Sequence, residues 1–129
     1  MDALSDAEFL VRFERHALGS FTHRDHIRVA YAYARRGGVE AAVAGARRIR
    51  DLALSAGHGA KYHETLTVGW ARVIAHLVER DPHLGFAEFL AAHPQLFDRR
   101  LLLRHYSSAR LFGDEARARF VEPDLVALP

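Results

Sequence analysis

Apolar residues recur at helical spacing along most of this chain, whereas the alternation that marks strands is scarce. Ser5 and Glu8 have the spacing of a capping box, which marks the start of a helix. Gly37 and Gly38 form a strong helix stop. These signals predict a first helix that ends at Gly19-Ser20 and others over Thr22 to Gly37-Gly38, about Val39 to Ser55, about Ala60 to Glu79, and Phe86 to Ala92.

Shorter helical turns are expected farther along, over Arg99 to His105, Ser108 to Phe112 and Asp114 to Phe120. The last residues resemble an extended tail, which we expect to pack on the helices through Val121, Leu125 and Leu128. A chain of 129 residues, 50% hydrophobic and 26% charged, suits one globular domain. We therefore predict a single all-α domain over residues 1–129, an irregular bundle of about five to seven helices with the tail packed on it.

The chain has no cysteine, which excludes disulfides, thiolate catalysis and metal sites built on cysteine. No apolar run approaches the length of a membrane span. The first residues, Met1 to Asp6, lack the pattern of a signal peptide. We therefore expect a cytoplasmic protein with no membrane partner.

Lys61 is the one lysine among the 18 basic residues, so the other 17 are arginine. The net charge is only +2, and the arginines are scattered over several segments. A nucleic-acid-binding surface concentrates basic residues on one face, so we do not expect nucleic acid as a partner. A helical protein whose arginines contact an acidic partner stays open as a minor alternative.

Two short clusters carry most of the chemical information: His23 with His26, and His63 with Glu64. A helix turns about 100° per residue, so His23 and His26 fall together on the apolar side of the second predicted helix. The same count places His63 on the inward side of the fourth helix, with Trp70, and Glu64 on its flank. Several inward-facing histidines call for a role beyond packing.

Short connections make consecutive helices antiparallel, so the second and fourth predicted helices should begin at the same end of the bundle. The end of the first helix, which carries His16, should reach that end as well. The two histidine clusters are therefore predicted to meet in one site.

Three imidazoles and a carboxylate suit zinc, iron, nickel or copper. In this interpretation His23, His26 and His63 are metal ligands, and Glu64 is a fourth ligand or a general base. The H-E-x-x-H motif is absent, so the spacing is not diagnostic. The simpler alternative is that hydrogen bonds satisfy these histidines in a small polar core. No organic cofactor is implied.

The same residues suit acid–base chemistry without a metal, in which Glu64 and His63 move a proton on a bound small molecule. Lys61 would hold an anionic group of that molecule, and Tyr62 and Trp70 would line its pocket. His58, in a glycine-containing loop, shows no comparable pattern.

Two blocks of this chain resemble a family of small uncharacterised all-α bacterial proteins: F-x-H-x-x-H-(hydrophobic)-x-x-A from Phe21 to Ala30, and K-Y-H-E-T from Lys61 to Thr65. The likeness continues in Tyr106-Ser107, in A-R-x-x-F-V-x-P-D-L from Ala116 to Leu125, and in the final Leu128-Pro129. It covers nearly the whole chain. The resemblance implies no particular reaction, but it marks the two histidine clusters as the site and the tail as part of the domain.

The favoured hypothesis is a small cytoplasmic enzyme that acts on a small molecule, through a histidine-rich metal centre or a His/Glu acid–base pair. The main alternative is a module that binds or senses a metal or small ligand without turnover.

Overall fold

The computed structural model describes residues 4–129, and this part of the chain is helical and contains no strand. The predicted all-α fold is therefore confirmed. The α-helices are α1 (Asp6–Glu14), α2 (His23–Arg47), α3 (Ile49–Ser55), α4 (Glu64–Arg80), α5 (Phe86–Ala92), α6 (Ser108–Leu111) and α7 (Asp114–Ala118), and the 3₁₀ helices are η1 (Gly59–Lys61), η2 (Pro94–Phe97) and η3 (Leu101–Arg104).

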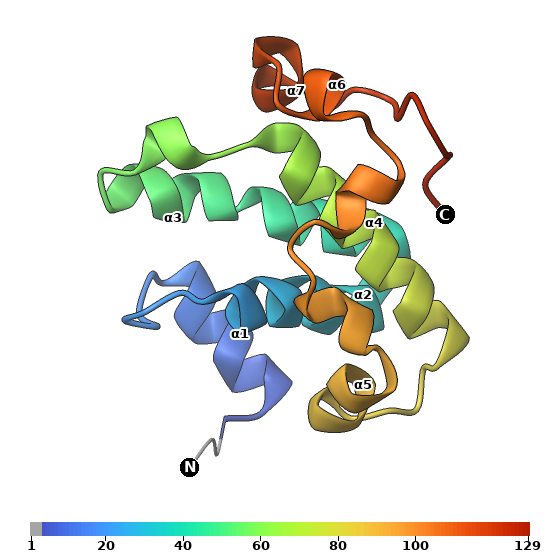
Figure 1. The fold of residues 1–129 in the computed structure, drawn as a ribbon. Coiled ribbons are helices and arrows are strands. Elements are labelled where there is room, and N and C mark those ends of the chain that lie inside the picture. The colour runs from blue at the N-terminus through green and yellow to red at the C-terminus, as the bar shows by residue number, and fades with distance from the viewer. Residues whose placement is uncertain (1–3) are drawn as a thin grey trace.

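Helix α2 is two segments joined at the predicted glycine stop. Gly37 (φ −154°, ψ 22°) and Gly38 (φ 74°, ψ −158°) leave helical geometry, and the positive φ of Gly38 is one that glycine adopts without strain. The chain reverses there, so that residues 39–47 and α3 run back along the first segment (Figure 1). A Cβ added at Gly45 would overlap the ring of Tyr33, so this glycine permits the two segments to pack closely.

The core forms mainly where α2 packs against α4. Ile27 from α2 and Ile74 from α4 are fully buried, and burying side chains of this size stabilises the fold by about 1.5–3 kcal/mol each. Tyr31 is buried against the rings of Phe86 and Phe89 of α5, with centroids 5.1 and 5.0 Å away. Helix α1 adds three buried residues to the same core, namely Phe9, Leu10 and Phe13.

The C-terminal residues are hydrogen-bonded to the helices. The hydroxyl of buried Thr65 accepts from the backbone N–H of Val121 (3.1 Å) and donates to the carbonyl of Arg119 (3.0 Å), and the hydroxyl of Tyr106 donates to the carbonyl of Val121 (2.6 Å). Val121 and Leu128 are buried, whereas Leu125 is 58% exposed. The predicted docking of the tail is confirmed, but Leu125 is held by its backbone rather than by burial of its side chain, since its N–H donates to the carbonyl of His105 (2.9 Å).

Within residues 4–129, no helix combines the length and the apolar character that crossing a bilayer requires.

We predict that Gly45→Ala destabilises the fold by about 1–3 kcal/mol, because the added methyl meets Tyr33, and this outweighs a gain in helix propensity of about 1 kcal/mol. Urea denaturation measures the change. In a Tyr33→Ala background the same substitution should cost much less, since the overlapping ring is gone. Equal stability of Gly45→Ala and the parent protein would contradict the close packing of the two α2 segments.

Candidate functional site

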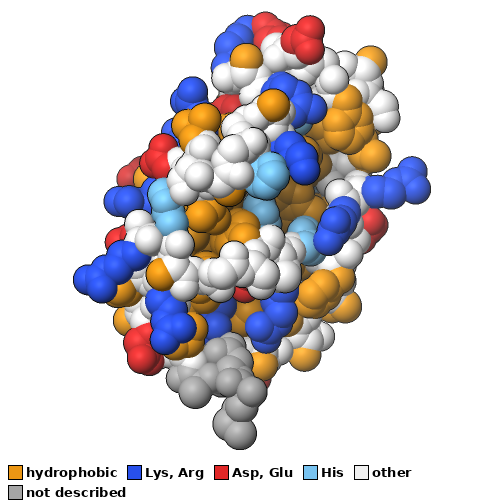
Figure 2. Space-filling view, turned by 90° about the vertical axis from the view of Figure 1, so that its left-hand side faces the viewer, with side chains coloured by type: hydrophobic (Ala, Val, Ile, Leu, Met, Phe, Trp, Pro, Cys, Tyr) orange, Lys and Arg blue, Asp and Glu red, His pale blue; other side chains and the backbone are white. Residues whose placement is uncertain are grey.

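A pocket of about 690 Å³ lies between the amino end of α2, the α3–η1 segment and α4. Figure 2 shows it as a hollow with hydrophobic side chains inside it, histidines on its walls and Lys or Arg side chains around it. Its apolar lining comes from three helices and includes Ile27, Ile49, Leu52, Leu66, Trp70 and Ile74. The pocket thus lies at the end of the bundle where the sequence predicts a site.

His23 and His26 both line the pocket, as their i,i+3 spacing predicts. They occupy the first turn of α2 because the Thr22 side chain caps that helix. His23 Nε2 donates a hydrogen bond to the carbonyl of Leu96 (2.8 Å), and its ring lies edge-on to Trp70 at 5.2 Å. Since a carbonyl only accepts, neutral His23 has its proton on Nε2 and presents Nδ1 as an acceptor.

Neither ring nitrogen of His26 has a partner among residues 4–129, and its ring rests against Phe21 with centroids 4.4 Å apart. The residue keeps an exposed surface, but protein atoms surround much of its ring. This loss of hydration, together with the charge of His23, lowers the pKa of His26 to about 4. At neutral pH the pocket therefore contains an uncharged imidazole that is free to accept a hydrogen bond.

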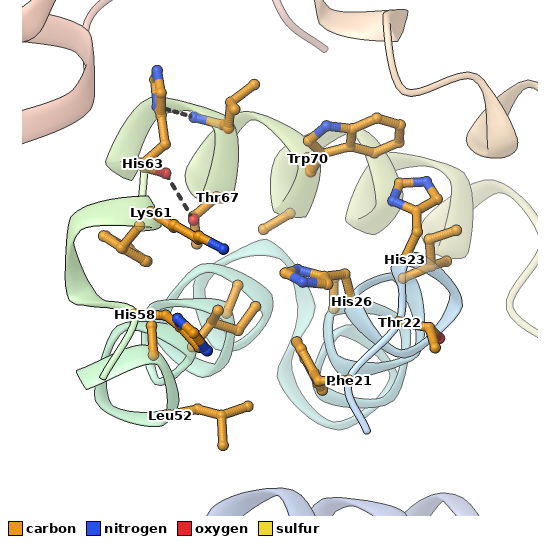
Figure 3. A pocket seen from close by; sticks show the side chains of 18 of the residues that line it. Phe21, Thr22, His23, His26, Leu52, His58, Lys61, His63, Thr67 and Trp70 are labelled. Atoms are coloured by element: carbon orange, nitrogen blue, oxygen red, sulfur yellow. Dashed lines mark hydrogen bonds between the residues drawn. The ribbon is translucent and has the colours of Figure 1, made fainter. Parts of the chain in front are cut away.

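His63 does not take the position that helical counting predicts. It precedes α4 in extended geometry (φ −136°, ψ 111°), and its Nδ1 caps the helix by accepting from the N–H of Leu66 (3.1 Å). Its Nε2 donates to the carbonyl of Leu111 (2.7 Å). Figure 3 shows the ring turned away from the pocket, so the backbone of His63 borders the cavity while both ring nitrogens are occupied elsewhere. This geometry does not support the predicted roles of His63 as metal ligand or catalytic group.

The carboxylate of Glu64 also forms hydrogen bonds that hold the structure together. Its Oε2 accepts from Arg47 Nε (2.8 Å) and its Oε1 accepts from the hydroxyl of Tyr62 (2.6 Å), which ties the end of α2 to the start of α4. Burial, and then the hydrogen bond to Glu64, raises the pKa of Tyr62. Glu64 is not among the described residues that line the pocket. The predicted role of Glu64 as general base or fourth ligand is therefore not supported by its contacts.

The described residues contain no group of three or more His, Asp or Glu side chains placed to hold one metal ion. His16, expected at the same end of the bundle, is exposed in a left-handed conformation (φ 56°) and does not line the pocket. The donor set His23, His26, His63 and Glu64 thus does not fit the predicted zinc, iron, nickel or copper centre. The reason is that α4 begins one residue after His63, which directs that ring to a cap.

The predicted ligand contacts Lys61, Tyr62 and Trp70 all line the pocket. Two further titratable residues that line it, His58 and Arg99, are absent from the predicted site. His58 could have been found from its closeness to Lys61 in the loop that leads into α4. Arg99 has no local signal, because the chain after η2 brings it to the pocket from far along the sequence.

The charge around the pocket is one-sided. Lys61 and Arg99 bring positive charge and form no ion pair with any described residue. No Asp or Glu is among the described residues that line the cavity. His23, His26 and His58 add hydrogen-bonding groups without adding negative charge. The arrangement favours a ligand with an anionic group and an apolar body.

Comparison with family models, with curated proteins and with solved structures finds no match for this chain. The resemblance to small bacterial proteins therefore stays a prediction, and the argument for function rests on the pocket.

We predict that acid destabilises the fold partly through His63. Burial lowers its pKa below the ordinary 6.5, so the unfolded chain binds protons more readily than the folded chain. The contribution of His63 to the free energy of unfolding is then complete above about pH 6.5 and is lost as the pH falls further. His63→Asn keeps a capping oxygen but cannot titrate, so chemical denaturation at several pH values should give a flatter stability profile below about pH 6.5.

At neutral pH the same variant should be less stable by about 1–3 kcal/mol, because the carbonyl of Leu111 loses its donor. His83→Asn, at an exposed histidine without a described partner, is the matched control and should leave both quantities unchanged. An unaltered pH profile in His63→Asn would show that the cap does not carry this dependence.

Proposed function

We propose that this protein binds a small organic anion with an apolar body in the pocket between α2, α3 and α4. The observation that carries the proposal is the combination of an apolar cavity with two unpaired basic side chains, Lys61 and Arg99, and no acidic residue in the described lining. The non-catalytic ligand-binding module that the sequence leaves open is thus the function that the site supports best.

The size and walls of the pocket fit such a ligand. A volume of about 690 Å³ lies within the range of roughly 300–1,000 Å³ that is usual for small-molecule sites. Trp70 and Leu66 of α4 and Leu52 of α3, all partly exposed, provide flat and branched apolar surface on which a ring or alkyl chain can pack. A purely polar anion would leave this surface without a partner.

The anionic group would lie near the cations. Figure 3 shows the side chain of Lys61 reaching into the pocket on the side that His26 faces. Arg99 lines the same cavity, and its charge helps to lower the pKa of His26. The amino end of α2, at Thr22 and His23, also borders the cavity, and its dipole favours negative charge. A carboxylate or phosphate is the expected head group.

A second candidate function is an acid–base enzyme that uses the same pocket, as the sequence analysis favours. The observation behind it is His26, which is uncharged at neutral pH and has no described partner. His26, in place of Glu64 and His63, would then act as the proton acceptor. In either case we place the protein in the cytoplasm, as the sequence predicts.

We predict that 3-phenylpropionate binds and that phenethylamine, which has a similar ring but a positive charge, does not. Trp70 is the one tryptophan of the chain and lines the pocket, so its fluorescence should report the titration. Lys61→Ala and Arg99→Ala should each weaken binding roughly five- to tenfold, since each removes a charge-assisted contact. Arg80→Ala, at an exposed arginine outside the described lining, is the control and should not.

Calorimetry with the same ligands makes the measurement independent of fluorescence. Equal binding of the anion and the amine would contradict the proposed charge preference. Failure of a range of aryl and alkyl carboxylates and phosphates to bind would contradict the proposed function as a whole.

A further inference from the structure

The one lysine of this chain has a chemistry that the 17 arginines lack. A primary amine adds to a carbonyl group and forms an imine, whereas a guanidinium does not do so under ordinary conditions. The chain uses arginine at every other basic position. Surface charge alone therefore does not explain why position 61 is lysine. The surroundings of Lys61 indicate a role for its amine.

Lys61 ends η1 and borders the pocket. In Figure 3 its amine extends toward the middle of the cavity, between His26 and Thr67. The amine has no hydrogen bond or ion pair with any described residue, and no carboxylate lines the described part of the pocket to hold it as a salt bridge. Its environment is that of a group placed to meet a ligand.

We propose that Lys61 forms a Schiff base with a small 2-oxo acid that has an apolar side chain. This inference rests on the proposed anion-binding function and deepens it by naming the reacting atom and the ligand class. The carboxylate of such a ligand would face Arg99, its apolar group would pack near Trp70, and its carbonyl carbon would lie within reach of Lys61 Nζ.

The step balances without any further reactant. The Lys61 ammonium first gives up a proton, and the neutral Nζ attacks the carbonyl carbon while the carbonyl oxygen takes up a proton. The resulting carbinolamine loses its hydroxyl as water when the nitrogen lone pair forms the C=N bond. One carbonyl oxygen leaves as water, one imine forms, and nothing is oxidised or reduced.

The surroundings of Lys61 allow this step. His26 is uncharged at neutral pH and so adds no positive charge beside the amine, and the proton that the ammonium loses passes to solvent, to which Lys61 is exposed. His58 lies in the same loop as Lys61 and borders the same cavity. Because Lys61 and His58 are exposed to water, the imine stays reversible, and reduction is needed to trap it.

Reductive trapping tests the proposal. Phenylpyruvate and cyanoborohydride are incubated with the full chain near neutral pH, and the product is analysed by intact mass and peptide mapping. The expected adduct has the mass of the keto acid less one oxygen atom and maps to Lys61. 3-Phenylpropionate, which has no keto group, should form no adduct and should slow the trapping by competition.

The matched control moves the amine without changing the composition. The double variant Lys61→Arg, Arg80→Lys places the one lysine at an exposed position outside the pocket. Trapping of this variant should be at least about tenfold slower than trapping of the parent. The reason is that the lysine at position 80 has no ligand bound beside it.

Trapping at Lys61 no faster than at position 80 of the double variant would overturn the Schiff-base proposal. If 3-phenylpropionate still binds in that case, only the imine inference fails. If neither anion binds, the proposed function fails as well, so the two failures are distinguishable.

Discussion

Helix α2 packs along α4, and the position of every wall of the pocket depends on this contact. The two helices share the buried core around Ile27 and Ile74, and their contact continues to the pair of His23 and Trp70 at the cavity. Because Gly38 reverses the chain, the second half of α2 and then α3 return to the same end and form the opposite wall. Protein interiors usually pack to high density and leave few voids. Here the hairpin holds two helical walls apart, and the cavity lies between them.

Polar residues near the pocket divide into two groups with different tasks. His63 and Glu64 are bound on all their strong hydrogen-bonding atoms, to the start of α4, to Leu111 and to Arg47 and Tyr62, so they hold segments together. His26 and Lys61 have no described partner and face the cavity. The distinction is physical, since a polar group that the fold leaves without a partner is hydrated and can exchange that water for a ligand.

This division changes the chemistry that the site can support. With the carboxylate of Glu64 committed outside the cavity, the described lining has positive charge and neutral imidazole but no negative group. Such a pocket attracts an anion, whereas a cluster of metal ligands would need several donors aimed at one point. The apolar walls then select among anions by the size and shape of the rest of the molecule.

The sequence by itself determined the helical class, the stop at Gly37 and Gly38, and the end of the bundle at which the site lies. These are local properties: periodicity, capping and glycine conformation act within a few residues, and short connections restrict helix direction. Tertiary structure alone decided the direction of each side chain. Helix α4 begins at Glu64 rather than near Ala60, so His63 caps the helix and its ring turns away from the pocket. Contacts with Arg47 and Tyr62 hold the carboxylate of Glu64 outside the cavity. Arg99 reached the cavity through packing of distant segments, which no local pattern encodes.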